Sequence, residues 1–182
     1  GREVARLLRA FNVKVLAAKR DVMHPEDHGY MVEGHGDPNG DCFDRLYPIE
    51  ALISMLKECD YVVITVPLTP QTRGLIGEEE LKAMKPGAYL VHVSRGGVVD
   101  EKALLQALTE KHLAGAAVDV FIQEPLPADN PLWKAPNLIL TPHVSGFSLR
   151  YKERAGIMFA ENLKRYLRGE SLLNDYQVER HY

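Results

Sequence analysis

Short runs of apolar, often β-branched residues alternate with amphipathic helical stretches along this chain, and this alternation limits its possible folds more than any other feature. Strands are expected at residues 13–18, 61–66, 88–93, 114–120 and 137–140, and helices at 2–11, 48–57, 78–84, 100–110 and 149–168. Strands that alternate with helices predict βαβ units on a parallel sheet. We therefore expect an α/β fold with a doubly wound parallel sheet, whose core is closed by the long last helix.

The composition argues against several classes of protein. The 182 residues are 46% hydrophobic and 26% charged, which is typical of a folded globular chain. A formal net charge of −3 argues against a nucleic-acid-binding protein or a basic membrane-surface protein. No apolar run approaches the roughly 18 residues that a membrane-spanning helix needs. Cys42 and Cys59 form no CxxC pair, and the first residues are charged where a signal peptide is apolar, so we expect a cytoplasmic location.

Two segments have no regular pattern. Residues 19–47 are polar and rich in Gly, Pro, Asp and His, and the sequence predicts neither a strand nor a helix there. A loop of this length is either functional or partly disordered. Gly169 is expected to stop the last helix, which divides the chain into a domain at 1–168 and a polar tail at 169–182.

Polar and conformationally special residues follow the predicted strands at the points where those strands end. They are Lys19 and Arg20, Pro67 to Thr69, Ser94 to Gly97, Asp119, and Thr141 to His143. In an open parallel sheet, ligands bind beyond the carboxyl ends of the strands. The series therefore predicts a binding or catalytic site at this edge.

Two of these positions, Arg95 and His143, suit anion binding and acid–base chemistry together with Glu124. Arg95 precedes two glycines, and its guanidinium could hold a carboxylate through paired hydrogen bonds or simply cap a loop. His143 suits a proton donor or acceptor, because an ordinary histidine pKa is about 6.5, although a lone histidine is often structural. Glu124, on the preceding loop, could orient the imidazole and keep it protonated, or it could be a solvated carboxylate. The spacing leaves both interpretations open.

Asp119, Lys19 and Arg20 each have two interpretations, as ligand-binding residues or as ordinary structural ones. Asp119 ends an apolar strand, where a carboxylate is costly unless it is hydrogen-bonded, so it could bind an amide of a ligand or cap backbone N–H groups. Lys19 and Arg20 end the second predicted element. In a dinucleotide-binding fold this position contacts the ribose, and basic residues there accommodate the 2′-phosphate of NADP. They could equally be ordinary surface cations.

Three segments of the chain resemble the D-isomer-specific 2-hydroxyacid dehydrogenase family. They are VPLTPQTRGLIG, VSRGGVVDEKALLQAL, and the stretch from AGAAVDVFIQEPLP to TPHVSG. The resemblance implies a Rossmann-type NAD(P)-binding domain. It also implies hydride transfer between NAD(P)H and a small 2-keto or 2-hydroxy acid, in a protein that is commonly a homodimer.

The resemblance also implies roles for particular residues. Arg95 would bind the substrate carboxylate and keto oxygen, His143 would be the general acid or base, and Glu124 would be its hydrogen-bonding partner. Asp119 would hold the nicotinamide carboxamide. The cofactor-binding set implied is Gly1, Lys19, Arg20, Pro67, Thr72, Val93, Ser94, Arg95, Asp119, His143 and Gly146, with no metal.

The chain departs from the family pattern in three places. Gly1 corresponds to the third glycine of GxGxxG, so we expect the first strand and the N-terminal substrate domain to be absent from this sequence, with the tail at 169–182 packing on that domain. Lys19 stands where the family usually has an acid, which favours NADP over NAD. His92 stands where the family usually has Asn, which affects the support of the loop but not the role of Arg95.

Two other functions remain open at this point. One is a non-catalytic NAD(P)-sensing protein, like the co-repressors of the same family, which retain similar catalytic residues. The other is a fragment without activity. A formate dehydrogenase of this family would have Gln at position 124, so Glu124 argues against that activity.

Overall fold

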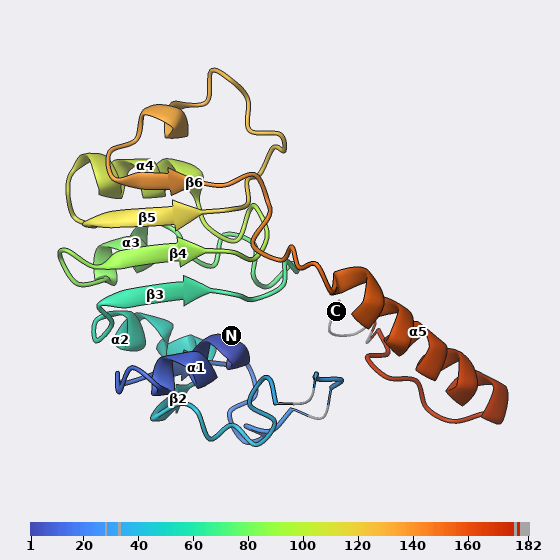
Figure 1. Cartoon of the computed structure of the whole chain (residues 1–182). Helices are drawn as coiled ribbons and strands as arrows, with labels where there is room; N and C mark the ends of the chain where they lie inside the picture. The colour runs from blue at the N-terminus through green and yellow to red at the C-terminus, as the bar shows by residue number, and fades with distance from the viewer. Residues whose placement is uncertain (28, 33, 177, 179–182) are drawn as a thin grey trace.

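The computed structural model describes residues 1–27, 29–32, 34–176 and 178, and its strands are all parallel (Figure 1). A two-stranded sheet pairs β1 (Leu16–Ala18) with β2 (Arg45–Tyr47). A four-stranded sheet has the order β3 (Tyr61–Ile64), β4 (Tyr89–His92), β5 (Gly115–Val118) and β6 (Leu138–Leu140). The expected parallel α/β arrangement is confirmed, and β1 and β3 to β6 are each shorter than their predicted ranges.

The helices connect these strands. They are α1 (Arg2–Arg9), the 3₁₀ turn η1 (Ile49–Ala51), α2 (Leu52–Leu56), α3 (Glu78–Ala83), α4 (Glu101–Thr109), the 3₁₀ turn η2 (Pro131–Lys134) and α5 (Tyr151–Arg168). In Figure 1, α3 and α4 lie behind the four-stranded sheet, whereas α1 lies in front of β2. The strands are therefore flanked by helices, with α3 and α4 on one face of the four-stranded sheet and α1 beside the two-stranded sheet.

Helix boundaries follow from local capping. The Asp100 carboxylate accepts hydrogen bonds from the backbone N–H groups of Lys102 and Ala103, at 2.9 and 3.1 Å, and so begins α4. Gly169 ends α5 with φ = 68°, in the left-handed region where glycine carries no Cβ penalty. Both ends are where the sequence predicted them.

The hydrophobic core lies between one face of the four-stranded sheet and helices α2 to α4. Successive side chains of a strand point to opposite faces. Val62, Leu90 and Val118 belong to the buried face and share one apolar cluster with helical side chains such as Leu56 and Leu104.

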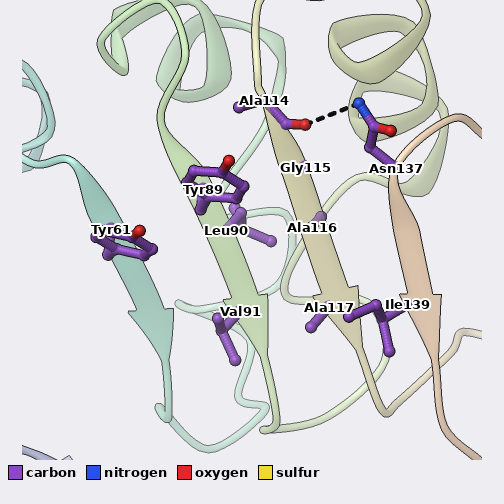
Figure 2. A pocket seen from close by; sticks show the side chains of 10 residues that line it. All are labelled: Tyr61, Tyr89, Leu90, Val91, Ala114, Gly115, Ala116, Ala117, Asn137 and Ile139. Carbon is purple, nitrogen blue, oxygen red and sulfur yellow. Dashed lines mark hydrogen bonds between the residues drawn. The ribbon is translucent and has the colours of Figure 1, made fainter.

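The opposite face of this sheet carries apolar side chains that are not covered by the described residues. We call it the open face and define it by Tyr61, Tyr89, Val91, Ala117 and Ile139 (Figure 2). The rings of Tyr61 and Tyr89 stack with their centroids 5.1 Å apart. Ile139 is 66% exposed.

The prediction of no regular structure in residues 19–47 is wrong at its end, because β2 lies there. This strand has three residues and begins with Arg45, so the sequence offers no apolar run that would reveal it. The rest of the stretch is tied to α1 where it is described. Arg2 donates to the backbone carbonyl of Asp37, and the buried Asp37 carboxylate accepts from the N–H groups of Asp41 and Cys42.

The prediction that the last helix closes the core is also wrong. No residue of α5 is buried, and Figure 1 shows the helix extending away from the sheets. Its contacts are with the tail: the Asn162 side chain accepts from the N–H of Leu173 and donates to its carbonyl. The helices of the described residues include none with the length and hydrophobicity of a membrane-spanning segment.

Candidate functional site

The loops that follow β3 to β6 begin at one level, because Ile64 pairs with His92, His92 with Val118, and Val118 with Leu140. We call this region the carboxyl edge and define it by residues 65–77, 93–100, 119–130 and 141–150. Figure 1 shows the four strand arrows pointing to it. Predicted site residues therefore leave the sheet side by side, which is the position where parallel sheets bind ligands.

Glu124 and His143 form a hydrogen-bonded pair at this edge. Nδ1 of His143 lies 2.8 Å from Oε2 of Glu124. The hydrogen bond from His143, followed by one from the backbone N–H of Phe121, lowers the pKa of the Glu124 carboxyl below its usual value. The ionised carboxylate therefore accepts from Nδ1, and Nε2 is the ring nitrogen that remains for a reacting group.

The backbone holds His143 in an uncommon conformation. Its φ is 56°, in the left-handed region that non-glycine residues rarely adopt. Its backbone N–H donates to the carbonyl of Asp119 at 2.8 Å. Such conformations cluster at functional sites, where the surrounding contacts hold them in place.

Asp119 caps the loop that carries His143. Its carboxylate accepts from the hydroxyl of Thr141 and from the backbone N–H groups of Val144 and Ser145, the latter two at 2.9 Å. Burial alone would raise the pKa of Asp119, but hydrogen bonds from Ser145 and Thr141 outweigh it and hold the pKa well below the usual range. Of the two interpretations of Asp119, these contacts favour the cap. The nicotinamide contact stays a prediction.

Arg95 lies on a turn that packs tightly against the loop of Glu124. A Cβ at Gly96 would lie 1.8 Å from the carbonyl oxygen of Phe121, so only glycine fits there. Arg95 itself is exposed, and its Nη1 donates to the carbonyl of Ser94 at 2.7 Å. The structure thus places the turn of Arg95 beside the loop of Glu124.

The predicted cofactor residues that follow β3 to β6 lie along the same edge, and Gly1 lies beside it. The Thr72 hydroxyl donates to the carbonyl of Pro67 at 2.6 Å and accepts from the N–H of Thr69, which fixes the loop after β3. A Cβ at Gly1 would lie 2.9 Å from Oγ1 of Thr65, so the N-terminus of α1 lies against the end of β3. A helix N-terminus favours negatively charged groups, so this close approach fits a dinucleotide phosphate.

Other predicted positions differ in burial. Ser94 is buried, Val93 is partly buried and Gly146 is exposed. Lys19 follows β1, and its ammonium donates to the backbone carbonyls of His24 and Glu26. Arg20 is exposed beside it. The structure brings Lys19 and Arg20 together at the end of β1, and Lys19 already binds the loop that follows.

Sequence reasoning missed two contacts of this edge. His92 is 2% exposed, and its Nδ1 lies 3.4 Å from the hydroxyl of Ser94. Its Nε2 has no hydrogen-bond partner among the described residues. Desolvation by burial lowers the pKa of His92 to about 4. Glu101 accepts a hydrogen bond from the backbone N–H of Ile122 at 2.6 Å. Its position in an acidic first turn of α4 signals only an interaction with the helix dipole.

Within the described part of the chain, no group of three or more His, Cys, Asp or Glu side chains could hold a metal ion. The side chains at the carboxyl edge instead provide a polarised imidazole, an ionised carboxylate and an exposed guanidinium. These groups suit proton transfer beside a bound anion.

Comparison with known proteins places the chain in a family. Residues 1–145 match the model described as the D-isomer specific 2-hydroxyacid dehydrogenase NAD binding domain. The chain is 50% identical over 123 residues to a glyoxylate reductase of Korarchaeum cryptofilum; the match covers 68% of this chain and 36% of that protein.

Two solved structures are similar in fold to this chain over its whole length. One is a D-isomer specific 2-hydroxyacid dehydrogenase from Xanthobacter autotrophicus in complex with NADPH, with 30% identity and a TM-score of 0.75 over 100% of this chain and 83% of that one. Another is a probable 2-hydroxyacid dehydrogenase from Rhizobium etli in complex with NADP, with 25% identity and a TM-score of 0.81 over 100% of this chain and 53% of that one. The Rossmann-type fold is therefore confirmed. This chain spans less than half of the curated relative's length.

Proposed function

The chain belongs to the D-isomer-specific 2-hydroxyacid dehydrogenase family, and we propose on this premise that the protein transfers a hydride between NAD(P)H and a small 2-keto or 2-hydroxy acid. The observation that carries the proposal is the Glu124–His143 pair beside the Arg95 turn, at the carboxyl edge of the sheet. The relative named glyoxylate reductase supports glyoxylate or a similar keto acid as the substrate.

We assign the chemistry to three residues of this chain. His143 delivers the proton from Nε2 to the developing alkoxide, and Glu124 fixes the ring through Nδ1. Arg95 binds the substrate carboxylate through its guanidinium fork. The hydride comes from the reduced nicotinamide when NAD(P)H is bound. In the reverse direction, His143 takes the hydroxyl proton.

The cofactor would lie along the carboxyl edge. The residues that we propose to contact it are Gly1, Lys19, Arg20, Pro67, Thr72, Val93, Ser94, Arg95, Asp119, His143 and Gly146. The close approach of Gly1 to Thr65 supports this placement, because it leaves the N-terminus of α1 at the edge.

Either NAD or NADP is compatible with the family, and we favour NADP on the basis of Lys19 and Arg20. Basic side chains at the end of the second strand of such a fold accommodate a 2′-phosphate. In this chain the Lys19 ammonium also binds the carbonyl of His24, so Lys19 holds its loop as well. The Lys19→Asp variant should shift cofactor preference toward NADH. Unchanged relative affinities for NADPH and NADH would contradict the assignment of Lys19 to the 2′-phosphate.

We also propose that the protein is a homodimer and that the tail at 169–182 packs on a substrate domain. The support for the dimer is the exposed apolar surface of α5, where Phe159 is 70% and Tyr166 72% exposed. Exposed apolar patches of this kind mark interaction surfaces. Light scattering tests the dimer, and a monomer at micromolar concentration would end that part of the proposal.

The central test measures cofactor binding and turnover separately. The protein is titrated with NADPH and NADH by calorimetry, and oxidation of each is then followed with glyoxylate and hydroxypyruvate. We expect binding and turnover, with Arg95→Ala weakening keto-acid binding and leaving cofactor affinity nearly unchanged. Binding without turnover would favour an NAD(P)-sensing protein. The absence of both would favour an inactive fragment.

A further inference from the structure

We propose that Glu101 is a positioning residue for the Glu124–His143 pair and that it acts through the backbone of Ile122. The inference rests on the proposed function for its meaning, since that function makes Glu124 the partner of the general acid. Its contacts, however, can be measured without cofactor or substrate.

Glu101 reaches the Glu124 loop from a different element. It is the first residue of α4, and Asp100 caps this helix immediately before it. Oε1 of Glu101 accepts from the N–H of Ile122 at 2.6 Å, although the two residues are 21 positions apart. A charged acceptor makes a stronger hydrogen bond than a neutral one. The contact therefore fixes the loop to the start of α4.

The bound backbone is the segment that sets the position of Glu124. Phe121 is buried, and its N–H donates to Oε1 of Glu124 at 2.9 Å. The Ile122 side chain is 66% exposed, so apolar packing does not hold this residue. The hydrogen bond to Glu101 therefore provides the anchor between Phe121, which is held by the core, and Glu124.

A second element presses on the same backbone. A Cβ at Gly96 would lie 2.7 Å from the backbone nitrogen of Ile122. Glu101 and Gly96 therefore contact one peptide group, from the helix and from the turn of Arg95. This arrangement couples the position of the acid–base pair to the substrate-binding turn.

Two charged groups act on the Glu124 carboxyl, His143 and Asp119. The hydrogen bond from His143 lowers the pKa of Glu124, and repulsion from the Asp119 carboxylate raises it. A glutamine at 101 retains an acceptor oxygen and removes the charge, whereas an alanine removes both. The two variants separate the position of the loop from the charge of Glu101.

The experiment is a carbon NMR titration of the Glu124 carboxyl in the wild-type protein and in E101A and E101Q. We expect the E101A variant to raise the Glu124 titration midpoint toward the ordinary value, because the loop loses its anchor. We expect E101Q to stay near wild type. Glu78, the first residue of α3, provides the matched control: E78A removes an acid from a helix first turn but does not touch the site.

Three results would overturn the inference: a Glu124 midpoint that does not move in E101A, an E101Q midpoint that moves as far as that of E101A, or an equal movement in E78A. Hydrogen exchange of the Ile122 amide in the wild-type protein provides a test that needs no variant. We expect protection of this amide, and rapid exchange would also overturn the inference. An inactive protein that passes these tests would refute the proposed function and leave the positioning role intact.

Discussion

The carboxyl edge and the open face belong to the same four strands, but they use side chains in opposite ways. At the edge, the carboxylates of Asp119 and Glu124 are each bound by donors from this chain. On the open face, Tyr61 and Ile139 are both more than 60% exposed. The difference indicates that the geometry of Asp119 and Glu124 is set by contacts inside the described chain, whereas the apolar side chains of the open face have no such contacts there.

The largest expected effect comes from breaking the close contact at the edge. Gly96→Ala would place a methyl group 1.8 Å from the carbonyl of Phe121. Overpacking of a rigid backbone should cost about 3 kcal/mol or more. Gly146→Ala is the matched control, because a Cβ there meets nothing within 4 Å and the cost should stay within about 0.5 kcal/mol. Urea unfolding of both variants measures the difference, and equal costs would contradict the tight contact.

The second prediction concerns pH and His92. The folded-state pKa is about 4 and the ordinary value 6.5, so between these pH values the unfolded chain binds more protons. Stability should therefore fall as pH is lowered through this window, by an amount on the order of 3 kcal/mol. Chemical unfolding between pH 4 and 7 measures it. His92→Asn should flatten the dependence, and an equally steep dependence in this variant would assign it to other groups.

The third prediction tests the cap on the His143 loop. Asp119→Asn removes the charge that binds Thr141, Val144 and Ser145, and should lower the free energy of unfolding by about 2 kcal/mol. The same measurement on Thr141→Val, which removes one of the donors, should show about half of that loss. A neutral Asp119→Asn substitution would mean that the carboxylate does not hold the loop.

The smallest effect is expected on the open face. Ile139→Ser replaces a side chain that is already 66% exposed, so the free energy of unfolding of this chain should change by less than about 0.5 kcal/mol. A loss well above this would show that the face is covered in solution. Light scattering of the same variant then distinguishes coverage by a second copy from coverage within one chain.

Sequence reasoning identified the elements best where a local signal exists. The start of α4 follows from Asp100, and the end of α5 from Gly169, because a cap is a short-range contact. β2 was missed because its three residues are specified by pairing with β1 rather than by their own pattern. The position of α5 was predicted wrongly. Amphipathicity indicates that a helix has an apolar face to bury, but it does not indicate which surface buries it.

In the candidate site, too, some features have a signal in the sequence and others do not. The strand-end rule brought Arg95, Asp119 and His143 to one edge, but spacing did not decide whether Glu124 reaches His143. The 2.8 Å contact depends on how the two loops fold over the edge. Glu101 left no signal, because its partner is a backbone N–H, which every residue except proline carries.

The contact between Gly96 and Phe121 has a mechanical consequence. Two backbones that touch at van der Waals distance, with no side chain between them, have no soft layer in which one could slide over the other. The turn of Arg95 and the loop of Glu124 therefore form one stiff unit. Any movement that brings Arg95 toward a bound anion must carry Glu124 with it, so we expect the flexible joints to lie outside residues 94–124.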